Sequence, residues 1–209
     1  MNQAEHVLRF WFSEPLTAAE LPRQMERCFR GGANAEIAAR FAGVLEEAAT
    51  GRLDHWSKTP RSRLALIVVL DQFSRAIHAG TARAYANDPK AVALTLEGIN
   101  GLHYTALEDP FQKTFFFLPL GHSEDLHNQE LVVKLADELV AKATPELRDW
   151  LAFSALQARG HRDVIALFGR HPHRNQVLGR VSTPEEAAYL ERGDFVHTRE
   201  LPPHLRGSG

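Results

Sequence analysis

The segment RSRLALIVVLDQFSRAI, residues 61–77, constrains the fold most, because every residue from Leu64 to Leu70 is apolar. A helix that is apolar on all sides must be covered by neighbours on several faces. The preceding Thr59 and Pro60 are typical of an N-cap followed by proline at the first helical position. LALIVVL alone would also suit a buried strand, but helix-forming residues on both sides extend the pattern past strand length. We therefore predict a buried central helix.

The same reading predicts helices along the rest of the chain. Ile37, Phe41 and Leu45 are spaced four apart, and Gly51 follows as a helix end. A glycine at position 160 is expected to break one of the later helices. Thr183 with Glu186 forms a capping-box pattern around a proline. Further helix starts are predicted at Asp88-Pro89, Asp109-Pro110, Ser123 and Thr144-Pro145.

These patterns predict an all-α protein with about eight or more helices. Short connectors make successive helices antiparallel pairs, arranged as a tetratricopeptide-like right-handed superhelical stack or as a compact bundle. The length of 209 residues suits one domain, which we place at residues 1–206. We interpret the final Gly-Ser-Gly, residues 207–209, as an expression scar.

Composition excludes several classes of protein. A net charge of −2 argues against a protein that coats nucleic acid, since such a protein carries a large excess of lysine and arginine. A single cysteine, Cys28, excludes an internal disulfide framework and a cysteine-based zinc cluster. Since the first residues lack the pattern of a secretory signal and no apolar run is of membrane-spanning length, we expect a soluble, cytoplasmic protein without membrane contact.

Polar chemistry gathers in three stretches. The first is LDQFSRAIH, residues 70–78, where Asp71, Arg75 and His78 are spaced four and three apart and share one helix face. That face emerges from the most apolar helix of the chain, so its charges need partners. A purely structural Asp71–Arg75 ion pair is the simplest explanation.

The second stretch, FLPLGHSEDLHNQE, residues 117–130, crowds polar side chains around a helix start. Capping by Ser123 or Asp125 explains part of it, because both side chains accept hydrogen bonds from first-turn N–H groups. Capping also accounts for the acidic Glu124, since acids are favoured in a first helical turn, but it does not explain His122, His127, Asn128 and Gln129.

The third stretch is FGRHPHRNQVLGR, residues 168–180, in which two glycines and a proline shape a loop. Its arginines present forked donors for carboxylate or phosphate, and its histidines titrate near neutral pH. A solvated basic loop is the alternative. The residues concerned are Arg170, His171, His173, Arg174, Asn175 and Arg180.

No metalloprotease, serine-hydrolase or nucleotide-binding motif is present in the sequence. His171 and His173 flank a proline, and with His122 or His127 and Glu124 they invite a metal hypothesis. Because this spacing is not specific for a metal, we assign no metal and no cofactor.

The chain resembles the family called Domain of Unknown Function 924, found chiefly in bacteria. The resemblance is carried by VLRFWF (7–12), LIVVLDQFSRAIHAGTARAYANDPKA (66–91), FFFLPLGHSEDLHNQ (115–129) and FGRHPHRNQVLGRVSTPEEAAYL (168–190). It implies an all-α, tetratricopeptide-like fold and no particular activity. Its segments coincide with the three polar stretches.

Two functions remain open. In the first, the three stretches converge on a polar cleft that binds, and acts on, an anionic small molecule. The catalytic candidates are then His122, His127, His171, His173, Asp71 and Asp125, and the ligand-binding candidates are Arg75, His78, Glu124, Asn128, Gln129, Arg170, Arg174, Asn175 and Arg180. In the second, a helical groove binds an acidic peptide or protein partner. RNA binding has only the basic loop in its favour.

Overall fold

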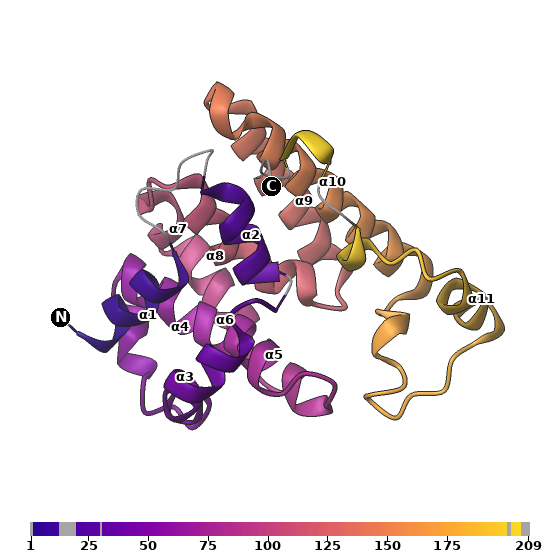
Figure 1. Cartoon of the computed structure of the whole chain (residues 1–209), viewed down its shortest axis with the longest axis horizontal. Coiled ribbons are helices and arrows are strands. Elements are labelled where there is room, and N and C mark those ends of the chain that lie inside the picture. The colour runs from indigo at the N-terminus through magenta and orange to yellow at the C-terminus, as the bar shows by residue number, and fades with distance from the viewer. Residues whose placement is uncertain (1, 13–19, 30, 200–201, 206–209) are drawn as a thin grey trace. The chain divides into compact units, whose positions relative to one another are not determined.

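The computed structural model describes residues 2–12, 20–29, 31–199 and 202–205, and every regular element among them is helical (Figure 1). The predicted all-α class is confirmed. The expression scar at 207–209 lies outside the described residues. None of the helices that the structure describes is long and apolar enough to cross a bilayer.

The chain divides into two compact units, Met1–Pro119 and Leu120–Ser208, and the division falls inside one helix. The single domain predicted for residues 1–206 stays a prediction, as does the superhelical stack.

The first unit contains the longer series of helices. These are α1 (Gln3–Trp11), α2 (Leu21–Phe29), α3 (Asn34–Ala49), α4 (Pro60–Val68), α5 (Ser74–Ile77), α6 (Asp88–Asn100), α7 (His103–Ala106) and most of α8 (Pro110–His122), with short 3₁₀ turns at Asp54–Lys58 and Ala82–Tyr85. The helix α2 was not predicted from the sequence.

The predicted central helix is confirmed, and one of its turns is π-helical instead of α-helical. The side chain of Thr59 caps α4 by accepting a hydrogen bond from the N–H of Ser62, and the apolar residues from Leu64 to Leu70 are fully buried. A π-helical turn at Val69–Phe73 joins α4 to α5. Phe73 then packs against Phe41 and Trp11, with ring centroids 5.0 and 5.6 Å apart, in the aromatic core of this unit.

The second unit is built on a helical pair. Here α9 (Leu126–Ala141) packs along α10 (Pro145–Phe168), to which a three-residue connector joins it, and a loop with the 3₁₀ turn η4 (Pro172–Arg174) leads to α11 (Pro184–Arg192) (Figure 1). Two further 3₁₀ turns follow, η5 (Val196–Thr198) and η6 (Pro203–Leu205). The capping box of Thr183 and Glu186 is present at the start of α11, as predicted.

The predicted break at Gly160 is wrong, because α10 passes through this position without interruption and is 24 residues long in all. A Cβ at position 160 would lie 3.0 Å from both methyl carbons of Val196 in η5. The glycine therefore serves a close approach between two segments and does not end the helix.

Candidate functional site

The first polar stretch forms an ion-pair cluster within the first unit. Arg75 Nη1 lies 3.0 Å from Asp71 Oδ1 and 2.7 Å from the Asp71 carbonyl oxygen, and its Nη2 lies 3.0 Å from Asp88 Oδ2. Asp71 is only 1% exposed, and the side-chain amide of Gln72 also donates to its carboxylate. Burial opposes the charge of Arg75, but the two aspartates outweigh it and keep its pKa above the ordinary value. This geometry matches a structural ion pair.

His78 follows α5 in the same unit and has no part in these ion pairs as they are described. Partial burial, and then the charge of Arg83, lowers its pKa. The convergence of Asp71, Arg75 and His78 with the other two stretches stays a prediction.

The second stretch proves to be largely a helix junction. Asp125 is the N-cap of α9 and accepts a hydrogen bond of 2.9 Å from the N–H of Asn128. Ser123 ends α8, because its hydroxyl donates to the Leu120 carbonyl oxygen. Gln129 is fully buried and its amide donates to the carbonyl oxygens of Gly121 and Ser123. These side chains join α8 to α9, and His127 is exposed on the surface.

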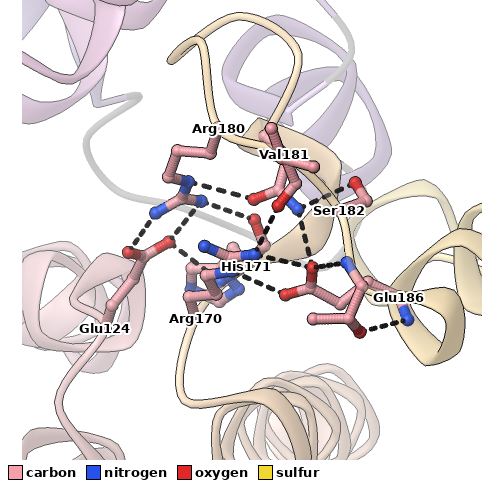
Figure 2. Close-up of polar contacts among 9 residues, drawn as sticks. Glu124, Arg170, His171, Arg180, Val181, Ser182 and Glu186 are labelled. Atoms are coloured by element: carbon pink, nitrogen blue, oxygen red, sulfur yellow. Dashed lines mark hydrogen bonds and ion pairs between the residues drawn. The ribbon is translucent and has the colours of Figure 1, made fainter.

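Glu124 connects this junction to the third stretch, whose residues after Phe168 belong to the loop between α10 and α11. Its carboxylate lies 2.6 and 3.0 Å from the two Nη atoms of Arg180 and accepts a 2.8 Å hydrogen bond from the N–H of His171 (Figure 2). Burial alone would raise the pKa of Glu124, but these donors and the nearby charge of Arg174 outweigh it and hold the pKa below its ordinary value. The second and third stretches therefore lie together.

A second carboxylate, Glu186, closes the loop from its other end. Arg170 donates to both of its oxygens, at 2.6 and 2.7 Å, and Asn175 donates to it at 3.1 Å (Figure 2). Asn175 also accepts from Nε of Arg180, so the two arginine–carboxylate pairs form one network. Hydrogen bonds from Arg170, against the effect of burial, lower the pKa of Glu186 to about 2. Arg170, Asn175 and Arg180, which the sequence suggested for ligand binding, thus hold the loop in shape.

Replacing Glu186 with glutamine tests this role. We expect the E186Q variant to lose about 2 kcal/mol of unfolding free energy, because Glu186 is 2% exposed and its loss leaves Arg170 without its carboxylate. Urea denaturation at pH 7 measures the change. The matched control is E185Q, which removes an exposed carboxylate from the same helix turn. Equal stability of the two variants would contradict the structural role.

Histidine rings gather around His171 and His173 of this loop. The ring centroid of His171 lies 5.7 Å from that of His161 and 5.3 Å from that of His173, and His173 lies 4.3 Å from His197. These rings come from α10, from the loop at η4 and from η5. We call His122, His161, His171, His173 and His197, together with Arg174, the histidine cluster.

The electrostatics of the cluster favour the neutral forms of His161, His171, His173 and His197. Burial first, and then the charges of Arg174 and the neighbouring rings, lowers the pKa of His171 far below its ordinary value. Burial followed by the other histidines and Arg174 lowers the pKa of His161 to about 3, and that of His173 to about 3 as well. His122 and Arg174 also act on His197, after burial, to lower its pKa.

His171 is the most unusual member. Its side chain is 1% exposed, and neither Nδ1 nor Nε2 has a hydrogen-bond partner. A buried polar group without a partner costs about 1–3 kcal/mol, so native proteins rarely keep one. Arg174 is also buried, at 6% exposure. The imidazole of His171, without a partner and beside a buried guanidinium, therefore lowers the stability of the folded state.

The sequence patterns indicated His122, His171, His173 and Arg174 as site residues but did not indicate His161 and His197. Those two are separated by 36 positions and come from a helix interior and a short turn near the C-terminus. Their one signal was the wealth of histidine in this half of the chain. Within the described ranges, no three histidine, cysteine, aspartate or glutamate side chains are placed to hold a metal ion.

Comparisons with known proteins agree with this picture of the fold. A solved structure of a protein of unknown function from Agrobacterium tumefaciens is 31% identical to the chain, with a TM-score of 0.70. The match covers 91% of this chain and 97% of the other. None of the curated proteins searched matches the chain. The model of a bacterial protein family of unknown function, DUF924, matches residues 7–194, and the chain belongs to that family.

Proposed function

We propose that the second unit binds an anionic small molecule, carrying a phosphate or carboxylate group, at the histidine cluster. The observation that carries the proposal is His171, a buried imidazole whose two ring nitrogens have no hydrogen-bond partner. A ligand that accepts a hydrogen bond from this ring would remove its desolvation cost.

The charge of the cluster favours an anion over a cation. The leading electrostatic influences on His161, His171 and His173 come from arginine and from other imidazoles. An anion is attracted to a buried guanidinium in a medium of low dielectric constant, and its oxygens accept hydrogen bonds from guanidinium and imidazole N–H groups.

Glu124, Arg180, Arg170 and Glu186 serve this site indirectly. Glu124 holds the backbone N–H of His171, and Arg180 donates to the His171 carbonyl oxygen at 3.0 Å. The paired carboxylates therefore fix the backbone of the residue whose ring contacts the ligand, and a site held in this way loses little entropy when it binds.

The site also has the groups for proton transfer. Imidazoles that are neutral at pH 7 can accept a proton from a bound molecule, which is the role of a general base. A bound anion stabilises the imidazolium form, so binding is expected to take up protons and to strengthen as the pH falls. The charged groups that act on these rings and share in this effect are Arg174 and Arg199, while Glu124 contacts the backbone N–H of His171.

An Arg174→Met variant tests the proposal. Thermal unfolding is followed while phosphate, phosphorylated small molecules, dicarboxylates and a glutamate-rich peptide are titrated at pH 6 and pH 8. For the wild type we expect stabilisation by at least one small anion, greater at pH 6. Because methionine keeps the length and removes the charge, R174M is expected to weaken binding by about a hundredfold, as loss of a buried charged partner does.

The control for this experiment is Arg192→Met, which removes an exposed arginine from α11 and should bind as the wild type does. Stabilisation by the peptide alone would favour the acidic-peptide function. Equal binding by R174M and the wild type, or a shift produced by Zn²⁺ and by none of the anions, would contradict the proposed function.

A further inference from the structure

One wall of the histidine cluster is the short segment Asp194–Arg199, which we call the strap. It contains η5, and its adjacent residues Val196 and His197 contact two different parts of the second unit. The ring of His197 lies 4.3 Å from His173, while the methyl groups of Val196 approach α10 at Gly160. Phe195 stacks on His197 with the two rings almost parallel. The strap therefore links the cluster to the surface of α10.

The close approach at Gly160 is specific to the strap. A Cβ there would meet both Val196 methyl carbons at 3.0 Å and Nη1 of Arg199 at 3.3 Å. Glycine inside a helix costs about 1 kcal/mol relative to alanine. In α10, a helix of 24 residues, this destabilising glycine stands at the position where the strap packs.

The cluster as it stands is closed. Both ring nitrogens of His171 are buried, whereas His197 is partly buried, is the most exposed residue of the ring series His171–His173–His197 and forms its outer end. A ligand reaches His171 only when one of the covering segments moves. Because exposure increases from His171 through His173 to His197, the segment that carries His197 lies between His171 and the solvent.

The strap is held less firmly than the loop on the other side. The loop is fixed by the two arginine–carboxylate pairs of Glu124 and Glu186. The backbone hydrogen bonds described for the strap close within residues 193–199, and side-chain packing of Val196 at Gly160 and of Phe195 on His173 and Tyr189 connects it to the rest of the unit. Segments whose backbone is hydrogen-bonded only within itself open locally at lower free-energy cost than segments held by ion pairs.

Space is available on the outer side of the strap. A groove of about 430 Å³ is lined by residues of α10, α11 and the strap, including Gly160, Leu167, Tyr189, Val196 and Arg199. Val196 thus packs against α10 at Gly160 and also lines this open volume. From these observations we propose that the strap is a gate, which opens at the Val196–Gly160 contact and lifts His197 from His173 to admit the anion. This inference rests on the proposed function of the same cluster.

A double variant, Gly160→Cys with Val196→Cys, tests the gate by locking it. The contact at Gly160 is close enough for the two side chains to bond when oxidised. The remaining cysteine, Cys28, does not interfere, because burial raises the pKa of its thiol to about 12 and leaves it unreactive. The reduced form of the same variant is the matched control, since it carries both substitutions without the bond.

Two readouts are measured on the oxidised and reduced forms. The first is the rate at which diethyl pyrocarbonate, a reagent for neutral imidazole, modifies His171 and His173. This measurement needs no ligand. The second is the association rate of phosphate, or of the anion that stabilises the wild type most. We expect oxidation to slow both rates by at least about tenfold, as closing a lid over a buried site does.

The two readouts separate the gate from the proposed function. Equal modification rates in the oxidised and reduced forms would overturn the gate, whatever binds. Slowed modification with no anion binding in either form would support the gate and overturn the proposed function. Slowed modification with unchanged anion association would mean that the anion enters elsewhere, and it would overturn the inference.

Discussion

Lowering the pH from 6.5 to 5 in a buffer free of binding anions is expected to remove several kcal/mol of the stability of this protein. His161 and His173 have pKa values lowered to about 3, and burial beside Arg174 lowers the pKa of His171 further. In the unfolded chain these rings titrate near 6.5, so the unfolded state binds more protons below that pH. Stability is therefore complete above pH 6.5 and is lost as the pH falls below it.

The size of this loss follows from linkage. Each histidine that stays neutral in the folded state removes up to about 1.4 kcal/mol of stability per pH unit, and a typical domain has only about 5–15 kcal/mol in total. Carboxylates affect the free energy of unfolding only at lower pH. The lowered pKa of Glu186, about 2, makes its contribution disappear only as the pH falls from 4.5 toward 2. Between pH 6.5 and 5 the histidines therefore dominate.

Urea denaturation at half-unit steps of pH measures the effect, with the free energy of unfolding extrapolated to water. Repeating the series with a stabilising anion at saturation should flatten the curve, because the bound anion favours the imidazolium forms. A free energy of unfolding that stays constant between pH 6.5 and 5 would contradict the neutral, buried cluster.

Replacing His171 with leucine is expected to separate stability from binding. Leucine is close to histidine in volume and has no polar atoms, so H171L removes a buried group that has no hydrogen-bond partner. We expect the variant without ligand to gain about 1 kcal/mol at pH 7 and more at pH 5. Anion binding is expected to weaken at least about a hundredfold, since the central donor is lost. Residues kept at the expense of stability are typical of functional sites.

The matched control is His127→Leu, at an exposed histidine on α9 outside the cluster. Thermal unfolding and calorimetric titration of both variants provide the comparison. If H171L is destabilised while anion binding is retained, His171 has a packing role and the proposed site is wrong.

Much of the fold followed from local sequence patterns. The Thr59–Pro60 start, the apolar run from Leu64 to Leu70 and the capping box at Thr183 report chemistry that is complete within a few residues. Gly160 was misread for the opposite reason. Its role depends on Val196, which is 36 residues away, and a local pattern contains no trace of that contact.

The site was predictable to a smaller extent. The sequence located the loop that contains His171, His173 and Arg174, because a basic loop with fixed glycines stands out in a slightly acidic chain. It did not show that Arg170 and Arg180 are already paired with Glu186 and Glu124. Nor did it indicate that His161 and His197 complete the cluster, since partners across a fold are set by tertiary packing.

The most direct test of the central claim is an NMR titration of the histidine Cε1–H resonances, without and with the anion that stabilises the wild type most. We expect the resonances of His161, His171 and His173 to show neutral rings down to pH 5 in the free protein, and to show protonation at a clearly higher pH when the anion is bound. Identical titration curves in the two conditions, or pKa values near 6.5 in the free protein, would contradict the account.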